Sequence, residues 1–394
     1  MLMDERQFLA VISGEQRGVA PALLCGALSV ASHVYAVGVA LRNVSFNHRW
    51  SRIHRVDAPV ISVGNLTTGG TGKTPFVAWL INDLRRRGRQ PGLLSRGYRS
   101  FAAPAKGGLG GVIPNSTSNF ARTPPTTPLE RGGERLNDEA QVIEWLCPGM
   151  PHVQQRDRVA GVHRLRNPGM AIPGLPVDVI LLDDGFQHRR LHRDLDIVLI
   201  DALQPWGYGR LLPRGLLREP PSALKRADIV LLTRADLVEP EALEELRHEI
   251  CRVRGIGSDG EIAFRPTRLV NASGQSRPLA ELSSMRVAAF CGIGNPHGFA
   301  RSLQSLGVTT FPRAFPDHHA YSPADWNELI RWGDAQSANI LVTTLKDLVK
   351  LPVDHPAASR VWAVDIGVEW LRGEQIVIER ISIVLGPTAQ CVAA

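Results

Sequence analysis

One feature constrains the fold of this chain more than any other, the glycine-rich segment Thr67-Thr68-Gly69-Gly70-Thr71-Gly72-Lys73-Thr74. The β-branched run 60–64 before it predicts a buried strand, and the apolar run 76–81 after it predicts a helix. Pro75 suits the first turn of that helix, because its missing N–H would have no helical partner there. Strand, loop and helix in this order are typical of a phosphate-binding loop.

Each residue type in the loop matches a contact that nucleotide phosphates need. Small residues let backbone N–H groups approach phosphate oxygens, Lys73 can reach the β- and γ-phosphates, and the Thr74 hydroxyl can bind Mg²⁺. The strict pattern has a glycine in place of Thr67, and Gly64 or Gly69-Gly70 can supply the tight turn instead. A chance glycine-rich hairpin is the alternative interpretation. The predicted nucleotide-binding residues of this segment are Gly69, Gly70, Thr71, Gly72, Lys73 and Thr74.

Length and composition limit the class of protein. A chain of 394 residues with 44% hydrophobic and 21% charged residues is long enough for two hydrophobic cores. The five cysteines show no paired spacing, which disfavours a disulfide framework or a zinc site and fits a reducing compartment. The net charge of +7 would suit a phosphorylated substrate or an anionic membrane surface. No known nucleic-acid-binding motif occurs, so we expect no nucleic acid, and nothing implies a protein partner.

The segment from Val19 to Leu41 is apolar over a length that could cross a bilayer or lie deep in it. Ala, Gly, Ser and His33 dilute its hydrophobicity, which favours an anchoring helix at the membrane over a full span. The segment before it lacks a basic region, which disfavours a cleaved signal peptide, and an ordinary buried helix is the other alternative. The positive-inside rule places the arginines that follow on the cytoplasmic side of the membrane: Arg42, Arg49, Arg52 and Arg55.

Strands and helices alternate along the rest of the chain, which indicates a parallel sheet with crossover helices. The predicted strands are 90–98, 177–184, 197–201, 227–232, 287–291, 340–343 and 361–365, and the predicted helices are 141–146, 240–254 and 297–306. Residues 101–130 are rich in Gly, Pro, Ser and Thr and predict a surface loop or a flexible insert. We predict an α/β protein with a P-loop NTPase-like parallel sheet, divided into a helical membrane anchor (1–46), a P-loop domain (47–284) and a smaller α/β domain (285–394).

Two adjacent acids, Asp183 and Asp184, follow the apolar strand residues 179–182. P-loop enzymes place carboxylates at such a strand end to hold Mg²⁺ or its water shell. Two solvated turn residues are the alternative, and the phosphate-binding loop upstream favours the metal role. The sequence therefore predicts Thr74, Asp183 and Asp184 as groups that hold Mg²⁺.

Several motifs accompany the loop: Val63-Gly64-Asn65-Leu66-Thr67, Ser95-Arg96-Gly97-Tyr98, Asp183-Asp184-Gly185-Phe186-Gln187-His188, and Leu212-Pro213 with Arg218-Glu219-Pro220. Together with the loop they resemble the motifs of the tetraacyldisaccharide 4'-kinase family, the lipid A 4'-kinases. The resemblance extends from the N-terminal helix to about Val364. It implies Mg²⁺-dependent transfer of the ATP γ-phosphate to the 4'-hydroxyl of an acylated glucosamine disaccharide 1-phosphate in the membrane. The N-terminal helix would then hold the active site at the bilayer surface.

The resemblance also implies roles for single residues. The family's Gly-Asp-Glu motif matches 137–139, which makes Asp138 the group that activates the sugar hydroxyl and Glu139 a further magnesium ligand. The Asp-His motif matches 317–318, and His318 is expected to pair with Asp138 when the two domains close. From the residues alone, 317–319 is more often a polar loop. Further nucleotide-binding residues implied by the family are Arg158, Gln187, Thr233 and Arg234.

The chain departs from the family pattern at several positions. Asn137 replaces the usual Gly, Leu345 replaces Glu in the Thr-Glu-Lys-Asp motif, and Arg214 and Leu216 interrupt a Pro-Ala-Gly-Pro turn. None of these changes removes a predicted catalytic group. They leave the acyl-chain preference and the support of the Asp138 loop open.

A P-loop GTPase switch is the main alternative, because the segment 233–236 follows a strand as the guanine-reading Thr-Lys-x-Asp motif does. Arg234 replaces the usual Lys, however, and Leu182 occupies the position of the acid in the switch motif Asp-x-x-Gly. A membrane-associated ATPase without a lipid substrate is a weaker alternative. A preference for ATP over GDP would separate the kinase from the switch.

Overall fold

The computed structural model describes residues 5–96, 130–131, 134–135, 137–166, 176–308 and 310–386. Apart from Glu130, the predicted insert 101–130 lies outside the described residues, as do Gly97 and Tyr98. The chain folds into two units. Unit 1 comprises Met1–Arg96, Pro151–Phe264 and Val368–Ala394, and unit 2 comprises Gly97–Met150 and Arg265–Gly367.

Unit 1 contains parallel strands in the order β9–β8–β7–β1–β6–β2–β5. Their bounds are β1 Val60–Asn65, β2 Pro91–Ser95, β5 His152–Gln154, β6 Val179–Asp183, β7 Leu195–Asp201, β8 Ile229–Thr233 and β9 Gly260–Asn271. Nearly every residue of the central strands is buried, as in a parallel sheet that is covered on both faces. The register aligns Val63 with Asp183, so the acids at the end of β6 lie beside the end of β1.

Helices cover the strands of unit 1. They are α3 Lys73–Arg86, α5 Arg158–Leu165, α6 Pro240–Arg254 and α10 Glu374–Leu385, with 3₁₀ turns η1 Gly207–Gly209, η2 Pro221–Arg226 and η3 Ala235–Leu237. The helix predicted over 240–254 is confirmed with the same bounds. Pro240 begins it, and Gly255 ends it with φ 88°, a left-handed conformation that favours glycine. Leu246 and Ile250 on its inner face join a core with Val230 and Leu232 of β8.

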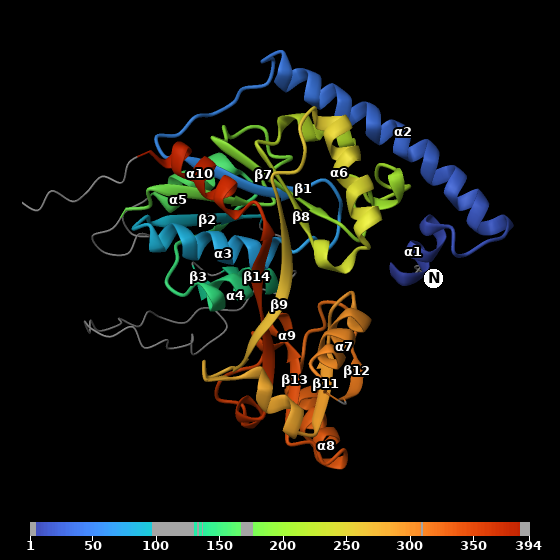
Figure 1. Ribbon diagram of the computed structural model, residues 1–394, viewed down its shortest axis with the longest axis vertical. Helices are drawn as coiled ribbons and strands as arrows, with labels where there is room; N and C mark the ends of the chain where they lie inside the picture. Colours follow the sequence, from blue (N-terminus) through green and yellow to red (C-terminus); the bar gives the residue numbers. More distant parts are fainter. Residues whose placement is uncertain are drawn as a thin grey trace, which may run out of the picture. The chain divides into compact units, whose positions relative to one another are not determined.

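Two helices precede the sheet, α1 Glu5–Ser13 and the long α2 Val19–Asn47 (Figure 1). Within the described residues, α2 is long and apolar enough to cross a membrane, judged by length and composition. One side of α2 contacts the rest of unit 1 through polar groups: Ser32 donates to the Leu211 carbonyl, Tyr35 to the Arg218 carbonyl and Asn43 to Glu219. Apolar side chains on α2 are exposed at Val19, Leu23, Val30, Val34, Val37 and Leu41.

Unit 2 has the strand order β12–β11–β13–β14–β9. The new strands are β10 Ser276–Arg277, β11 Val287–Cys291, β12 Thr310–Ala314, β13 Ile340–Thr344 and β14 Val361–Arg372, and a hairpin pairs β3 Glu130–Arg131 with β4 Glu134–Arg135. The helices are α4 Asp138–Leu146, α7 Pro296–Ser305, α8 Pro323–Ala335 and α9 Leu345–Leu348, with 3₁₀ turns η4 Leu279–Ser284 and η5 Pro356–Ser359. Strand β10 is antiparallel to β9, so the predicted parallel sheet is in fact mixed and mostly parallel.

The boundaries of the units differ from the division at 284 and 285 that the sequence suggested. Val142 of α4 shares a core with Phe290 and Leu345, which places α4 in unit 2. The C-terminal helix α10 belongs to unit 1, where Arg89 donates to the Leu385 carbonyl at 2.9 Å. Strands β9 and β14 each begin in one unit and end in the other. A division by position along the chain cannot show such long-range packing.

Candidate active site

The phosphate-binding loop connects β1 to α3 and depends on glycine at Gly72. This residue has φ 82° and directly precedes α3. A Cβ atom here would lie 2.1 Å from the Phe264 ring, so any side chain would clash. Thr233 donates to the Thr71 carbonyl at 3.1 Å, and Arg234 donates to the Gly70 carbonyl at 2.6 Å while it also pairs with Asp201. Thr233 and Arg234, which were predicted to bind nucleotide, therefore hold the phosphate-binding loop in place.

Lys73, the first residue of α3, is held at the end of β1. Its Nζ donates to Oδ1 of Asn65 at 3.2 Å and lies 3.8 Å from Oδ1 of Asp184. Arg218 contacts both carboxylate oxygens of Asp184 at 2.7 Å. Burial raises the pKa of Asp184, but the charges of Lys73 and Arg218 outweigh it and hold the pKa below its usual range. Asp184 is therefore ionised at neutral pH, beside the predicted phosphate site.

Other predicted residues gather at the same strand ends. Arg158 is buried and donates to the Asp183 carbonyl at 3.2 Å, and Gln187 donates to the Asn65 carbonyl at 2.9 Å. Among the described residues, no group of three or more His, Cys, Asp or Glu side chains could hold a metal ion. Mg²⁺ commonly binds through one or two carboxylates together with phosphates and water. The ionised Asp184 carboxylate fits this donor set, together with Asp183, which precedes it, and Thr74, which follows Lys73.

The remaining predicted residues lie in unit 2. Asp138 is the first residue of α4, whose N-terminus is capped by the Asn137 side chain. Its Oδ2 lies 2.9 Å from Nδ1 of His318 and 3.0 Å from Nζ of Lys350. The expected Asp138–His318 pair thus forms inside one unit, without the domain closure that the sequence suggested. Glu139 points to a different partner, with Oε1 3.7 Å from Nζ of Lys346.

The contact between Asp138 and His318 shifts the pKa of both side chains. Burial raises the pKa of Asp138, but the hydrogen bonds from His318 and Lys350 outweigh this effect and lower the pKa to about 2. The hydrogen bond to Asp138 raises the pKa of His318 above its usual value, against the effect of burial. A carboxylate of such low pKa is a weak base by itself. With an imidazole on the same oxygen, a proton taken by the pair has a second place to reside.

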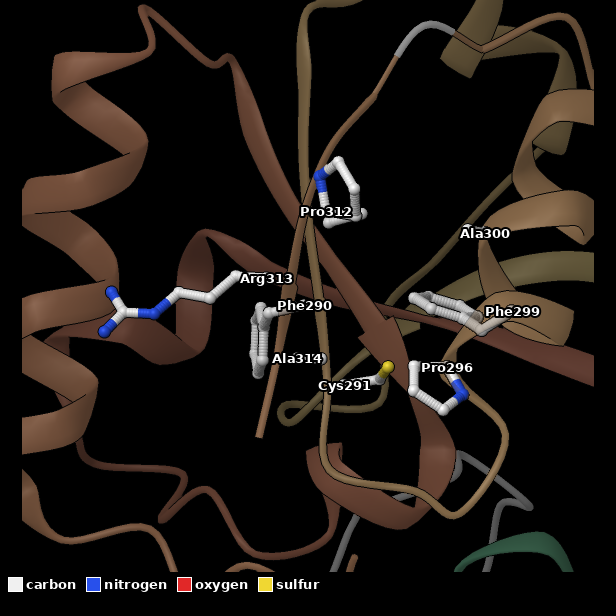
Figure 2. Close-up of a pocket in the computed structure, with 9 residues that line it drawn as sticks. Phe290, Cys291, Pro296, Phe299, Ala300, Pro312, Arg313 and Ala314 are labelled. Atoms are coloured by element: carbon white, nitrogen blue, oxygen red, sulfur yellow. The ribbon is translucent and has the colours of Figure 1, made fainter. Parts of the chain in front are cut away.

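A small pocket elsewhere in unit 2 contains none of the predicted residues. Figure 2 shows its lining, which is apolar apart from Arg313, and the Cys291 thiol lies close to Pro296. Burial and the charge of Asp347 raise the pKa of Cys291 to about 11. A protonated thiol among apolar groups offers no catalytic chemistry.

Comparisons with known proteins identify the family of this chain. The family model described as LpxK, tetraacyldisaccharide-1-P 4'-kinase, matches residues 24–385. The tetraacyldisaccharide 4'-kinase of Halothermothrix orenii is 35% identical over 361 residues, which cover 89% of each chain. That of Syntrophus aciditrophicus is 40% identical over 338 residues, covering 82% of this chain and 83% of the relative. The chain belongs to the tetraacyldisaccharide-1-P 4'-kinase family.

A solved member of the family supports the same conclusion. The crystal structure of the "apo" form of LpxK from Aquifex aeolicus in complex with ATP has a TM-score of 0.68 and 28% sequence identity, and the match covers 92% of this chain and 100% of that one. The family resemblance found in the sequence is confirmed, and the chain is an ATP-dependent lipid kinase of lipid A biosynthesis. This assignment replaces the GTPase switch and the ATPase without a lipid substrate.

Sequence reasoning did not single out three residues that contact the predicted site residues of this kinase: Asn65, Arg218 and Lys350. Asn65 and Arg218 belong to motifs on which the family resemblance rests, so the sequence marked both residues but did not indicate what they contact. Lys350 had no such signal, because its distance to Asp138 is a product of tertiary packing.

Proposed function

We propose that this kinase transfers the γ-phosphate of ATP to the 4'-hydroxyl of tetraacyldisaccharide 1-phosphate, with Lys73 at the transferred phosphate and Asp138 at the acceptor hydroxyl. The observation that carries these roles is the separation of two sets of groups. In unit 1 the cations Lys73 and Arg218 lie beside Asp184, whereas unit 2 offers an ionised carboxylate with a histidine partner. The first set suits phosphates, and the second suits a hydroxyl proton.

In unit 1, the backbone N–H groups of the loop would bind phosphate oxygens, and Lys73 would stabilise the charge that develops on the γ-phosphate. Thr233 and Arg234 support this role because they fix the carbonyls of Thr71 and Gly70, which orients the loop. Mg²⁺, when bound by Thr74, Asp183 and Asp184, would neutralise phosphate charge. Arg158 and Gln187 would complete the nucleotide contacts.

In unit 2, Asp138 would accept a hydrogen bond from the 4'-hydroxyl and orient its oxygen toward the γ-phosphorus. As the new P–O bond forms and the bond to the β–γ bridging oxygen breaks, the hydroxyl proton passes to the Asp138–His318 pair and ADP leaves. The 2.9 Å contact supports proton sharing within the pair.

The enzyme would bind its lipid substrate at the cytoplasmic face of the inner membrane. The exposed apolar side chains of α2 support this location, because a helix that binds its own protein through polar groups can lay an apolar side into the bilayer. The membrane surface is then the second partner of the chain, besides the acylated disaccharide.

Incubation with labelled ATP and tetraacyldisaccharide 1-phosphate, followed by mass analysis of the lipid, tests the reaction. We expect the lipid to gain one phosphate at the 4'-position. ATP consumption without a phosphorylated lipid would contradict the proposal and revive an ATPase.

A further inference from the structure

Lys350 contacts several oxygen atoms in unit 2, and the proposed reaction gives this lysine no role. Its Nζ is 3.0 Å from Oδ2 of Asp138, donates to the His319 carbonyl at 3.1 Å and lies 3.9 Å from Oδ1 of Asp347. Only 12% of its side chain is exposed. Removing an ammonium from water costs free energy unless charges compensate it, and two carboxylates do so here.

Asp347 fixes the position of this lysine. Its carboxylate is fully buried and accepts hydrogen bonds from the Gly292 backbone, the Tyr321 hydroxyl and the Thr344 hydroxyl, at 3.0, 3.1 and 2.7 Å. Thr344 ends β13 and Asp347 belongs to α9. The ammonium is therefore held from a packed strand and helix, which restrict its movement more than a surface loop would.

Both partners of Asp138 use the same carboxylate oxygen. His318 and Lys350 contact Oδ2, and among the described residues no hydrogen bond reaches Oδ1. The side chain of Asp138 is 23% exposed, so the carboxylate is open to solvent on one side. Oδ1 is thus the atom available to an acceptor hydroxyl.

The two partners differ in how firmly they can hold the carboxylate. The His318 side chain is 57% exposed, and its residue has φ 57° in the loop after β12. Water screens an exposed charge and competes for its hydrogen bonds, whereas a buried charge is screened much less. Lys350 is therefore the stronger constraint on the orientation of Asp138, and His318 is the more exposed partner, which can exchange a proton with solvent.

We propose that Lys350 is a positioning residue of phosphoryl transfer, which holds Asp138 through Oδ2 so that Oδ1 receives the acceptor hydroxyl. This inference rests on the proposed role of Asp138. The ammonium also favours the ionised form of Asp138, so the carboxylate can accept the hydroxyl proton throughout the neutral range.

The test compares Lys350→Met with Lys350→Arg and with Lys225→Met, a matched change at an exposed lysine of η2. We expect Lys350→Met to lower kcat about tenfold to a hundredfold, with the KM for ATP unchanged, because a misdirected group loses alignment in the transition state. The acidic limb of its kcat–pH profile should move to higher pH, since Asp138 binds a proton more readily without the ammonium. Lys350→Arg should restore part of kcat and the position of that limb, and Lys225→Met should match the unaltered enzyme.

Normal kcat and an unshifted acidic limb in folded Lys350→Met would overturn the inference. Circular dichroism and thermal denaturation verify folding, and Lys350→Gln replaces the Met variant if that variant does not fold. Asp138→Asn, measured in parallel, separates the two levels of the argument. If the Asp138→Asn variant is inactive and the Lys350→Met variant is fully active, only the proposed role of Lys350 is contradicted. If the Asp138→Asn variant is active, the proposed role of Asp138 is contradicted as well.

Discussion

The groups proposed to bind nucleotide in unit 1 and the groups proposed to bind the acceptor in unit 2 are built differently. Asn65, Gly72 and Lys73 belong to one strand–loop–helix segment, where backbone conformation sets their positions. Asp138, His318 and Lys350 come from three separate segments, and the first two are 180 positions apart. The nucleotide group therefore depends mostly on local geometry, whereas the acceptor group depends on the packing of α4 against the core of unit 2. Substitutions in the two regions should have different consequences.

The largest effect is expected at Lys73. Lys73→Ala should lower kcat roughly a hundredfold or more, about 3 kcal/mol, because it removes a charge at the transferring phosphate. The thermal stability should change little, since the removed group contributes no core volume. Turnover of the lipid, measured by mass analysis beside the exposed-site control Lys225→Ala, checks this. Near-normal turnover of Lys73→Ala would exclude Lys73 from the mechanism, and the proposed difference between the nucleotide group of unit 1 and the acceptor group of unit 2 would then have no support.

The acceptor group should respond as a coupled unit. Asp138→Ala and His318→Ala should each lower kcat strongly, and the double variant should lose much less than the product of the single losses. The affinity for ATP should stay nearly constant, because neither side chain is assigned to the nucleotide phosphates. Single-turnover kinetics and equilibrium binding of ATP measure the two quantities.

Two exposed residues of unit 2, His297 and Asp354, provide matched alanine controls for these variants. Both controls should retain full turnover. Losses at Asp138 and His318 that multiply cleanly would show that the two residues act independently, which contradicts a shared proton.

A third comparison concerns the two sides of α2. Replacing Val30, Val34 and Val37 by Glu should reduce binding to anionic vesicles roughly tenfold or more, because each exposed apolar side chain contributes a fraction of the 1.5–3 kcal/mol of full burial. Turnover of a detergent-dispersed substrate should persist. Vesicle sedimentation measures the effect, and the same change at the exposed Ile376 and Ile383 of α10 is the control. Unchanged sedimentation of the α2 variant would remove this helix from membrane binding.

The smallest expected effect is a change in the pKa of His318. The raised pKa of His318 means that its protonated form stabilises the folded chain below the unfolded value near 6.5, and this contribution is lost as the pH rises through the folded pKa. Asp138→Asn should move the pKa of His318 downward, because it removes the hydrogen bond that raises it. The charges of Asp317 and Lys346 also face the imidazole and remain in place. NMR titration of the imidazole measures the shift, and an unchanged or higher pKa in the variant would contradict the pairing.

Local patterns predicted much of unit 1. The strands β1, β6, β7 and β8 were expected from apolar runs, and the helix α6 had the predicted bounds. Over the whole chain, strands β3, β4, β5, β9, β10 and β12 were not predicted. Most residues in the middle of β9 are only half-buried or exposed, so its sequence lacks the continuous apolar run of its neighbours.

The sequence by itself determined the phosphate-binding loop, because strand, glycines, lysine and helix are adjacent and their conformations follow from local sterics. The sequence also determined the family, because several motifs in separate parts of the chain all match the same family. Tertiary structure alone decided that α4 belongs to unit 2, that α10 belongs to unit 1, and that Lys350 reaches Asp138. These contacts join residues far apart in the chain, and they form because apolar faces such as that of Val142 must leave water together. No short pattern along the chain specifies which of many apolar faces will meet.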